Sequence, residues 1–431
     1  MNKRWTPRLT VMTTCMAIAV GLTACGQGED GSDGETKLTM YYPVAVGGPL
    51  TKVVDKFVAD YEAENPDVDI EAIYSGTYRE TMTKAQTGFR ARQGPDLAVL
   101  LASELYTLTD SKMIVPYDDL LKNDDQQWLK GFYPALMKSS RDGTGKTWGV
   151  PFQRSTIVQY YNKDLFAKAG LDPLKGPDTW GTLVSAAQNI KKSGVANYGI
   201  EIPTTDYGFW FLQALSAQSG KEIFNPDGTE VYFDAPETVR ALEFLVSLGT
   251  KRIMPKGTIE WGSTPEDFIQ GQTAMMWSTT GNLTSIRDKA KFKFGVTPLP
   301  ANSQAASPTG GGNLYIFKTS DEKQQAALKF VQWLSEPKRA ADWSIATGYI
   351  ATSPASYDTD AMKKYIKEFP QALVARDQLS KAVPELTTHA AGRLTELLND
   401  AVAAAVTGEE SPREALSNAQ EQADSVLQQY K

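Results

Sequence analysis

The chain has few of the side chains on which most catalytic centres depend. Its 431 residues include one histidine, His389, and two cysteines, Cys15 and Cys25. A Ser-His-Asp triad or a histidine-based metal site would have to use that one histidine, and a lone histidine in a helical region is more often structural. We therefore expect no catalytic residue, no bound metal and no cofactor.

The chain also lacks an excess of basic residues and, beyond its N-terminus, a long apolar run. It carries 44 Lys and Arg against 51 Asp and Glu, whereas a nucleic-acid-binding protein would show a basic patch or stripe. No later stretch approaches the roughly 18 apolar residues of a membrane helix. Gly145-Lys146-Thr147 is not a phosphate-binding P-loop, because Ser140 stands where that motif needs glycine. We expect no binding to nucleic acid and no internal membrane span.

The N-terminus has the layout of a secretory signal. Three basic residues precede a short apolar stretch, and Leu22-Thr23-Ala24-Cys25 matches the bacterial lipobox, in which the cysteine is acylated and becomes the mature N-terminus. An ordinary leader with an incidental cysteine is the alternative. The following residues are rich in Gly, Asp, Glu and Ser, which suits a flexible tether. We expect a lipoprotein signal peptide at 1–24, a tether at 25–36 and lipidation at Cys25, so that no disulfide forms.

Strand and helix patterns alternate along the remaining chain. Residues 37–42 have strand character, residues 50–65 place apolar side chains at helical spacing, and residues 97–101 form the continuous apolar run of a buried parallel strand. The second half repeats this alternation, and the chain from Asp360 onward is mostly helical. The pattern predicts an α/β fold with doubly wound lobes. About 400 residues after cleavage are enough for two separate cores.

Four segments could line one ligand-binding cleft. Tyr41-Tyr42 ends the first strand, where open α/β sheets place their ligands. The Gly-rich segment 308–313 could offer backbone N–H groups to an anion, or could be a flexible connection. Segment 279–282 offers hydroxyl groups before a helix, or a simple helix cap. The last segment is an aromatic cluster that could stack on a sugar or belong to a core: Tyr207, Phe209, Trp210 and Phe211.

Several motifs resemble one family over nearly the whole mature chain. They are the lipobox and tether, segment 57–66, Pro151-Phe152-Gln153-Arg154-Ser155-Thr156 with the following Tyr160-Tyr161-Asn162-Lys163-Asp164, segment 268–276, and Thr347-Gly348-Tyr349. The chain resembles the extracellular solute-binding proteins of ABC importers, in the class that includes maltose-binding protein. Within that class it is most similar to the glycerol-3-phosphate-binding proteins.

The resemblance implies a set of ligand-binding residues. Family positions carry over to Tyr78, Ser155, Thr280, Gly311, Gly312, Tyr349 and a phosphate-binding Arg376, with Tyr207 or Trp210 as the stacking aromatic. Tyr42 is added from the strand-end argument above. One departure is Arg79, which stands where the family has an acid. A changed polyol end, a glycerophosphodiester or a non-phosphorylated sugar would suit such a change.

The resemblance also implies the architecture. We expect the two-lobe periplasmic-binding-protein (type II) fold, with hinge strands joining the lobes and the ligand cleft between them. The N-lobe would comprise residues 37–153 and 310–357, and the C-lobe residues 154–309 and 358–431. The hinge would lie near Gln153-Arg154 and Thr309-Gly310.

The implied protein is a receptor and not an enzyme. We expect a monomeric, extracytoplasmic, lipid-anchored solute-binding protein that gives glycerol-3-phosphate or a related polyol phosphate to the membrane subunits of an ABC permease. A receptor for a neutral sugar or oligosaccharide is the first alternative, favoured if Arg376 points away from the cleft. A secreted lyase or glycosidase and an adhesive lipoprotein are the others.

Overall fold

The computed structural model describes residues 35–431, with only the backbone at 123 and 124. The predicted signal peptide (1–24), Cys25 and the tether up to residue 34 lie outside the described residues. Within residues 35–431, none of the helices combines the length and the hydrophobicity of a membrane span.

The strands form one mixed sheet. Its main path runs β2-β1-β3-β7-β4-β5, with β6 paired to β4 and β8 paired to β7. Only the pairs β1–β2, β1–β3 and β7–β8 are parallel. The predicted α/β class is confirmed, and the sheet is mixed, with its parallel pairs at β1 and β8. The strands are β1 (Thr36–Tyr42), β2 (Val68–Tyr74), β3 (Leu97–Leu101), β4 (Val150–Asn162), β5 (Met275–Thr279), β6 (Phe294–Thr297), β7 (Ser307–Ile316) and β8 (Ala382–Val383).

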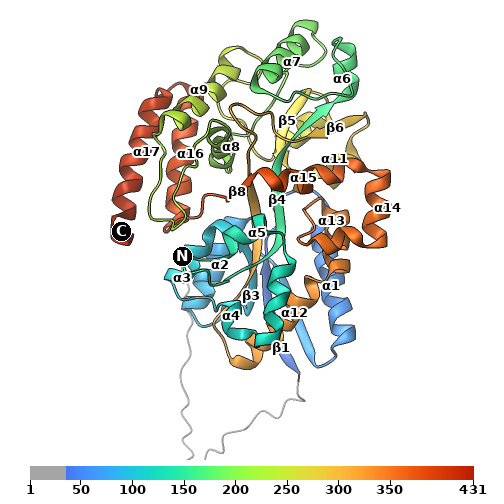
Figure 1. Ribbon diagram of the computed structural model, residues 1–431, viewed down its shortest axis with the longest axis vertical. Helices are drawn as coiled ribbons and strands as arrows, with labels where there is room; N and C mark the ends of the chain where they lie inside the picture. Colours follow the sequence, from blue (N-terminus) through green and yellow to red (C-terminus); the bar gives the residue numbers. More distant parts are fainter. Residues whose placement is uncertain (1–34) are drawn as a thin grey trace, which may run out of the picture. The chain divides into compact units, whose positions relative to one another are not determined.

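Two separate hydrophobic cores lie on either side of the middle of this sheet. One core draws its buried side chains from residues 38–152 and 314–349, and we call the part of the chain around it the N-lobe. The other draws them from residues 157–299 and 386–427, and we call its surroundings the C-lobe. Figure 1 shows the first group of elements in the lower half of the view and the second group in the upper half.

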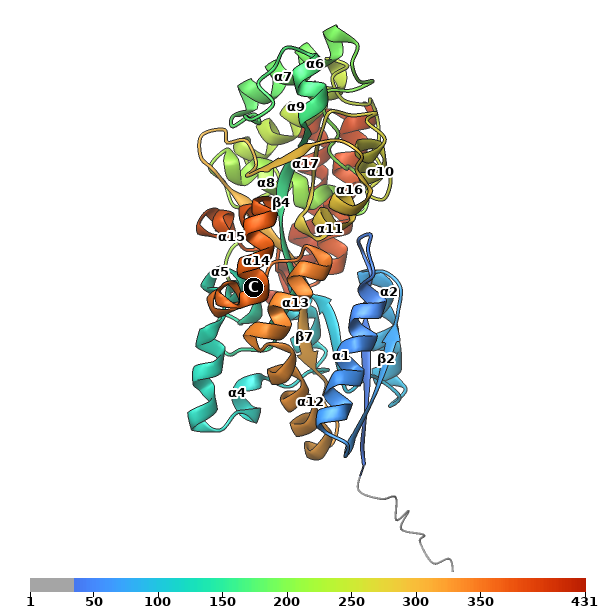
Figure 2. The ribbon, with the colours of Figure 1, turned by 90° about the vertical axis from the view of Figure 1, so that its right-hand side faces the viewer.

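Two strands, β4 and β7, pass from one lobe to the other. All 13 residues of β4 are buried; its first half pairs with β7 and its second half with β5 and β6. The far end of β7 pairs with β3 in the N-lobe, and its first residues pair with β8. Figure 2 shows β4 and β7 running through the middle of the molecule. Side chains at this crossing are therefore fixed by strands that belong to both lobes.

The helices cover the sheet and begin at recognisable caps. Capping boxes start α2 at Thr77–Glu80 and α17 at Ser411–Glu414, which satisfies backbone N–H groups of the first turn. All residues of α8 are buried, so this helix lies inside the C-lobe core. The helices are α1 (Leu50–Glu64), α2 (Tyr78–Arg90), α3 (Leu105–Asp110), α4 (Tyr117–Leu120), α5 (Pro134–Met137), α6 (Lys163–Lys168), α7 (Trp180–Ser193), α8 (Gly208–Gln218), α9 (Pro236–Thr250), α10 (Thr264–Ile269), α11 (Leu283–Lys289), α12 (Asp321–Leu334), α13 (Pro337–Thr347), α14 (Asp360–Glu368), α15 (Leu373–Gln378), α16 (Ala391–Thr407) and α17 (Pro412–Leu427).

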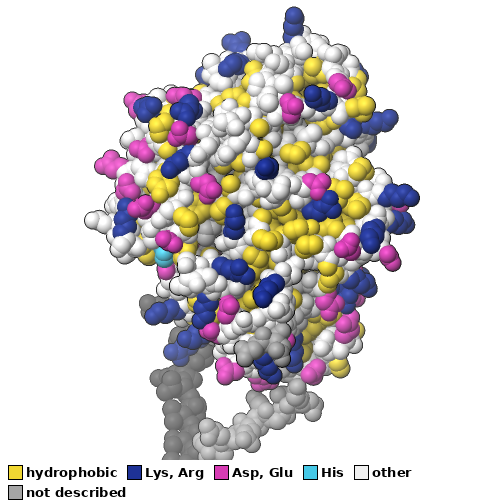
Figure 3. All heavy atoms as spheres, viewed as in Figure 1, with side chains coloured by type: hydrophobic (Ala, Val, Ile, Leu, Met, Phe, Trp, Pro, Cys, Tyr) yellow, Lys and Arg dark blue, Asp and Glu magenta, His cyan; other side chains and the backbone are white. Residues whose placement is uncertain are grey.

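Charged side chains of both signs are interspersed over the surface. Figure 3 shows Lys and Arg beside Asp and Glu across the visible face, and the described residues on that face form no extended area of one sign.

Candidate functional site

A small cavity of about 30 Å³ lies where the crossing strands meet the lobes, and we call it the inner cavity. It draws side chains from β4, β5 and β7 and from the loops after β1 and β8, so residues far apart in the chain meet there. Five of its 13 lining residues are aromatic, and the lining carries five side-chain hydroxyl groups, three of them on tyrosines, and one carboxyl group. The lining residues are Ala45, Val46, Tyr78, Leu101, Ser155, Tyr207, Trp210, Trp261, Thr279, Gly310, Gly311, Tyr349 and Glu385.

The inner cavity is the deep end of a larger cleft of about 810 Å³, which we call the outer cleft. Six residues line both: Ala45, Val46, Tyr78, Leu101, Tyr207 and Trp261. A volume in this range is typical of sites for small molecules. A ligand in the outer cleft could therefore place one of its groups in the inner cavity.

Glycine in β7 is required at the inner cavity. A Cβ atom on Gly310 would lie 2.4 Å from Cζ2 of Trp210, and Gly311 has a φ of +90°, which other residues rarely adopt. Trp210 Nε1 donates to the carbonyl oxygen of Thr309 at 3.0 Å, which fixes the indole against β7. The Gly-rich segment 308–313, expected either to offer backbone N–H groups to an anion or to be a flexible connection, is part of a buried strand, and Gly310 makes room for Trp210.

Two tyrosines from the N-lobe side are fixed beside the crossing strands. Tyr78, the first residue of α2, donates its hydroxyl hydrogen to Gln153 Oε1 at 2.8 Å. Tyr349 follows α13 and stacks on Trp343 at 6.1 Å between ring centroids. Burial raises the pKa of both hydroxyl groups well above the usual value, so both stay protonated. Gln153 takes the hydroxyl hydrogen of Tyr78, so the Tyr78 oxygen is left to accept a hydrogen bond from a ligand.

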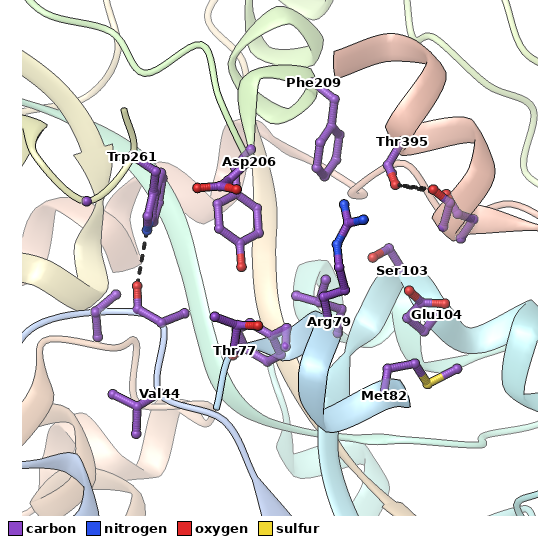
Figure 4. Close-up of a pocket in the computed structure, with 18 of the residues that line it drawn as sticks. Val44, Thr77, Arg79, Met82, Ser103, Glu104, Asp206, Phe209, Trp261 and Thr395 are labelled. Atoms are coloured by element: carbon purple, nitrogen blue, oxygen red, sulfur yellow. Dashed lines mark hydrogen bonds between the residues drawn. The ribbon is translucent and has the colours of Figure 1, made fainter. Parts of the chain in front are cut away.

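Aromatic rings of the C-lobe close the inner cavity from the other side. The rings of Tyr207 and Trp261 meet edge to face at 4.7 Å between centroids. Trp261 Nε1 donates to the carbonyl oxygen of Ala45 in the N-lobe at 3.1 Å, as Figure 4 shows. This hydrogen bond joins the lobes across the mouth of the inner cavity.

A second contact between the lobes involves the one histidine. The His389 ring stacks between Tyr106 and Tyr430, at 4.5 and 4.4 Å between centroids. Its Nδ1 lies 2.7 Å from Oδ2 of Asp110. Tyr106 and Asp110 belong to α3 of the N-lobe, whereas His389 precedes α16 of the C-lobe. His389 therefore has a structural position between the lobes.

The inner cavity and the outer cleft carry different charges. Among the described residues that line the inner cavity there is one acid, Glu385, and no lysine or arginine. In the outer cleft, Arg79 extends from α2 into the open space near Phe209 (Figure 4). Burial raises the pKa of Glu104 on the same wall, and the Arg79 charge partly offsets that rise. Any anionic group of a ligand would thus meet a basic side chain only in the outer cleft.

Six of the residues predicted from the sequence meet at the inner cavity. They are Tyr78, Ser155, Tyr207, Trp210, Gly311 and Tyr349. Thr279 belongs to segment 279–282, which was expected to line the cleft, although Thr280 was the residue chosen from it. No sequence signal pointed to Trp261 or Glu385, because neither stands in a motif. Arg79, noted above only as a departure from the family pattern, lies in the outer cleft.

The other four predicted residues do not line the inner cavity. Tyr42 packs in the N-lobe core against Tyr74, at 6.1 Å between centroids. Thr280 faces β4 and accepts from the Thr156 N–H at 3.4 Å, while its neighbour Thr279 takes the lining position. The Cα atom of Gly312 is covered, since a Cβ there would lie 2.6 Å from Val99.

Arg376 is the most consequential of these corrections. Its guanidinium group pairs with Asp377, the next residue, at 2.6 Å and lies over the Tyr357 ring at 4.9 Å. Neither partner lines the inner cavity or the outer cleft. Nearby charge and aromatic partners thus hold Arg376 away from the place where a phosphate-binding residue is needed.

The chain is similar to known binding proteins over nearly its whole length. Curated relatives include the sn-glycerol-3-phosphate-binding periplasmic protein UgpB of Escherichia coli K12, 29% identical over 97% of each chain. UgpB of Shigella dysenteriae serotype 1 is 28% identical, also over 97% of each chain.

Solved structures share the fold. The cyclic alpha-maltosyl-1,6-maltose binding protein of Arthrobacter globiformis is 25% identical with a TM-score of 0.78, covering 91% of this chain and 99% of that one. UgpB of Mycobacterium tuberculosis in complex with glycerophosphocholine is 22% identical with a TM-score of 0.81, covering 93% and 100%.

A family model described as bacterial extracellular solute-binding protein matches residues 56–371. This match covers well over half of the chain and confirms the expectation of a binding protein rather than an enzyme. The chain belongs to the family of bacterial extracellular solute-binding proteins.

Proposed function

We propose that this protein is the receptor of an ABC importer for a neutral, hydroxyl-rich solute, a sugar or an oligosaccharide. The observation that carries the proposal is the lining of the inner cavity: aromatic rings and hydroxyl groups, one carboxyl group and, among the described residues, no basic side chain. Aromatic faces cover the carbon face of a sugar, and fixed polar groups orient its hydroxyls. A phosphate buried there would touch no basic side chain of the lining and would lie beside the Glu385 carboxyl group, which is unfavourable even with Arg154 buried behind the crossing strands.

A second candidate ligand is a glycerophosphodiester. Its glycerol end would occupy the inner cavity, and its phosphate would face Arg79 in the outer cleft. The UgpB relatives and the position of Arg79 favour this candidate. Glycerol-3-phosphate itself is less well supported, because Arg376 lies outside both spaces.

The crossing strands serve as the hinge around which the lobes close. The guanidinium group of Arg154 in β4 donates to the carbonyl oxygen of Gly311 at 3.1 Å and to Thr309 Oγ1 at 3.0 Å. These bonds tie the two main crossing strands together directly behind the inner cavity. Closure around a ligand expels water and strengthens the polar contacts inside. The closed, monomeric receptor then delivers its ligand to the permease.

Cys25 carries the lipid that holds the receptor at the outer face of the membrane. The support is the sequence Leu22-Thr23-Ala24-Cys25 and the polar residues that follow it. The Cys25→Ala variant should leave the membrane fraction and appear in the soluble fraction. Equal recovery of variant and wild type in washed membranes would contradict the lipid anchor.

Thermal unfolding of the tether-free protein tests the ligand class. The panel is maltose, trehalose, glycerophosphocholine, glycerol-3-phosphate and inorganic phosphate. A ligand at about 100 times its dissociation constant stabilises the native state by about 2.7 kcal/mol, which raises the melting temperature by a few degrees. We expect the rise with a neutral sugar. A rise only with glycerophosphocholine would replace this proposal by the second candidate, and no rise with any compound would overturn both.

A further inference from the structure

Glu385 is a buried acid that the fold itself does not use. It follows β8, the short strand that pairs with the first residues of β7, and it lines the inner cavity with 2% of its surface exposed. Within the described part of the chain, its Oε2 atom has no hydrogen-bond partner. A buried carboxyl oxygen without a partner destabilises the empty protein, so a stabilising role in the fold does not explain this residue.

The charged groups around Glu385 leave it without an ion pair. The side chain of Arg154 is completely buried nearby, but it donates to Gly311, Asn313 and Thr309, and no ion pair joins it to Glu385 within 4.0 Å in residues 35–431. Burial raises the pKa of Glu385 to about 8; Arg154 opposes the rise and Glu104 adds to it. Two further titratable groups lie close enough to interact with its charge: Tyr207 before α8 and Tyr315 in β7.

The Oε2 atom of Glu385 is therefore available to accept a hydrogen bond from a ligand. We propose that Glu385 is a specificity-determining ligand-binding residue, which accepts a hydrogen bond from a hydroxyl group of the solute in the inner cavity and disfavours phosphate there. This inference rests on the proposed function. It names Glu385 as the residue that contacts the solute at the deep end of the site. The aromatic rings around the cavity exclude water, which strengthens a hydrogen bond to a carboxylate.

The chain contains a matched control for this residue. Glu201 is also an acid with an unpartnered Oε2 among the described residues, it is 3% exposed, and burial raises its pKa to about 7. It lies in the C-lobe beside β5 and lines neither the inner cavity nor the outer cleft. Glu385→Gln and Glu201→Gln thus make the same chemical change inside and outside the site.

Isothermal titration of wild type, Glu385→Gln and Glu201→Gln tests the inference, with maltose, trehalose, glycerophosphocholine and glycerol-3-phosphate as probes. At pH 9, where the Glu385 carboxyl group is ionised, we expect Glu385→Gln to weaken binding of the neutral sugar about tenfold, because a charge-assisted hydrogen bond becomes a neutral one. Glu201→Gln should bind like the wild type. A Glu385→Gln variant with wild-type affinity would overturn the inference and leave the receptor for sugars standing.

The pH dependence of binding gives a second readout, which a purely structural role would not change. A hydroxyl that donates to Glu385 stabilises its ionised form, so binding releases a proton and sugar affinity of the wild type should rise between pH 6 and pH 9. The rise should persist in Glu201→Gln and vanish in Glu385→Gln. The same rise in all three proteins would overturn the inference. If the wild type binds none of the sugars, the proposed function itself is wrong. The titration of the wild type alone shows this, so that failure is distinguishable from a failure of the inference about Glu385.

Discussion

The inner cavity and the outer cleft are continuous, yet they are built in different ways. The inner cavity takes its polar groups from the crossing strands, where residues such as Ser155 and Gly311 are fixed by backbone pairing. The outer cleft takes exposed charged side chains from helices, among them Arg79 from α2 and Arg393 from α16. Fixed groups discriminate between ligands because they cannot adapt, whereas exposed charges are screened by water and salt. Selectivity is therefore expected to reside in the inner cavity.

The largest effect should come from removing the indole that forms one wall of the inner cavity. Trp210→Ala leaves a void against Gly310 and an unpaired carbonyl oxygen on Thr309. We expect a loss of about 3 kcal/mol in the free energy of unfolding and of most sugar binding. Chemical denaturation and titration calorimetry measure the two losses.

Trp210→Phe is the control for that change, because it keeps most of the ring and removes only the N–H donor. It should retain a large part of both stability and affinity. If Trp210→Ala bound sugar as well as Trp210→Phe, the inner cavity would not be the selective part of the site.

The next effect concerns stability as a function of pH. Burial raises the pKa of Glu385 to about 8 and that of Glu201 to about 7, both above the ordinary value of 4.5. Between those values the native state holds protons that the unfolded state has lost, so stability should fall as the pH rises from about 5 to 8 and then level off. Urea unfolding at five pH values measures the fall, and Glu385→Gln should make it shallower. A fall of the same size in that variant would show that Glu385 does not titrate as a buried group.

A smaller effect is expected at the mouth of the inner cavity. Trp261→Phe removes the hydrogen bond to Ala45 that joins the lobes, while the ring remains against Tyr207. We expect sugar affinity to fall about fivefold, the equivalent of about 1 kcal/mol for one neutral hydrogen bond. Trp180→Phe is the matched control, because Trp180 Nε1 donates to Gln218 within the C-lobe. Equal effects of the two changes would assign the loss to the fold rather than to the contact between the lobes.

The sequence predicts the strands better than the polar part of the site. The apolar run of β3 and the alternation of helices and strands are local patterns, and they identify the α/β class directly. Glu385 has no local signature, since one acid after a proline becomes a site residue only when β8 pairs with β7. For the Gly-rich segment 308–313 the sequence left an anion-binding stretch and a flexible connection open, because it does not show that Trp210 packs on Gly310.

Arg79, in the outer cleft, gives a further test of the difference between the inner cavity and the outer cleft. Arg79→Gln should change the affinity for a neutral sugar by less than about twofold, because an exposed charge contributes little to binding an uncharged ligand. For a glycerophosphodiester, Arg79→Gln should lower the affinity about tenfold, and this loss of affinity should become smaller as salt is added. Titrations with maltose and with glycerophosphocholine at two salt concentrations separate the two candidate ligands. A large loss with maltose would contradict the proposed difference between the two spaces.

The smallest effect is expected for Arg376→Ala. The resemblance to glycerol-3-phosphate-binding proteins gave this residue the role of holding a phosphate, but its guanidinium group pairs with Asp377 and covers Tyr357. An exposed pair of adjacent residues contributes little to stability, so both the melting temperature and the affinity for every probe should stay near the wild-type values. Loss of glycerophosphocholine binding in Arg376→Ala, with Arg79→Gln unaffected, would place the phosphate at Arg376. Such a result would require α15 to turn toward the cleft when a ligand binds. It would favour a phosphate-containing ligand over a neutral sugar.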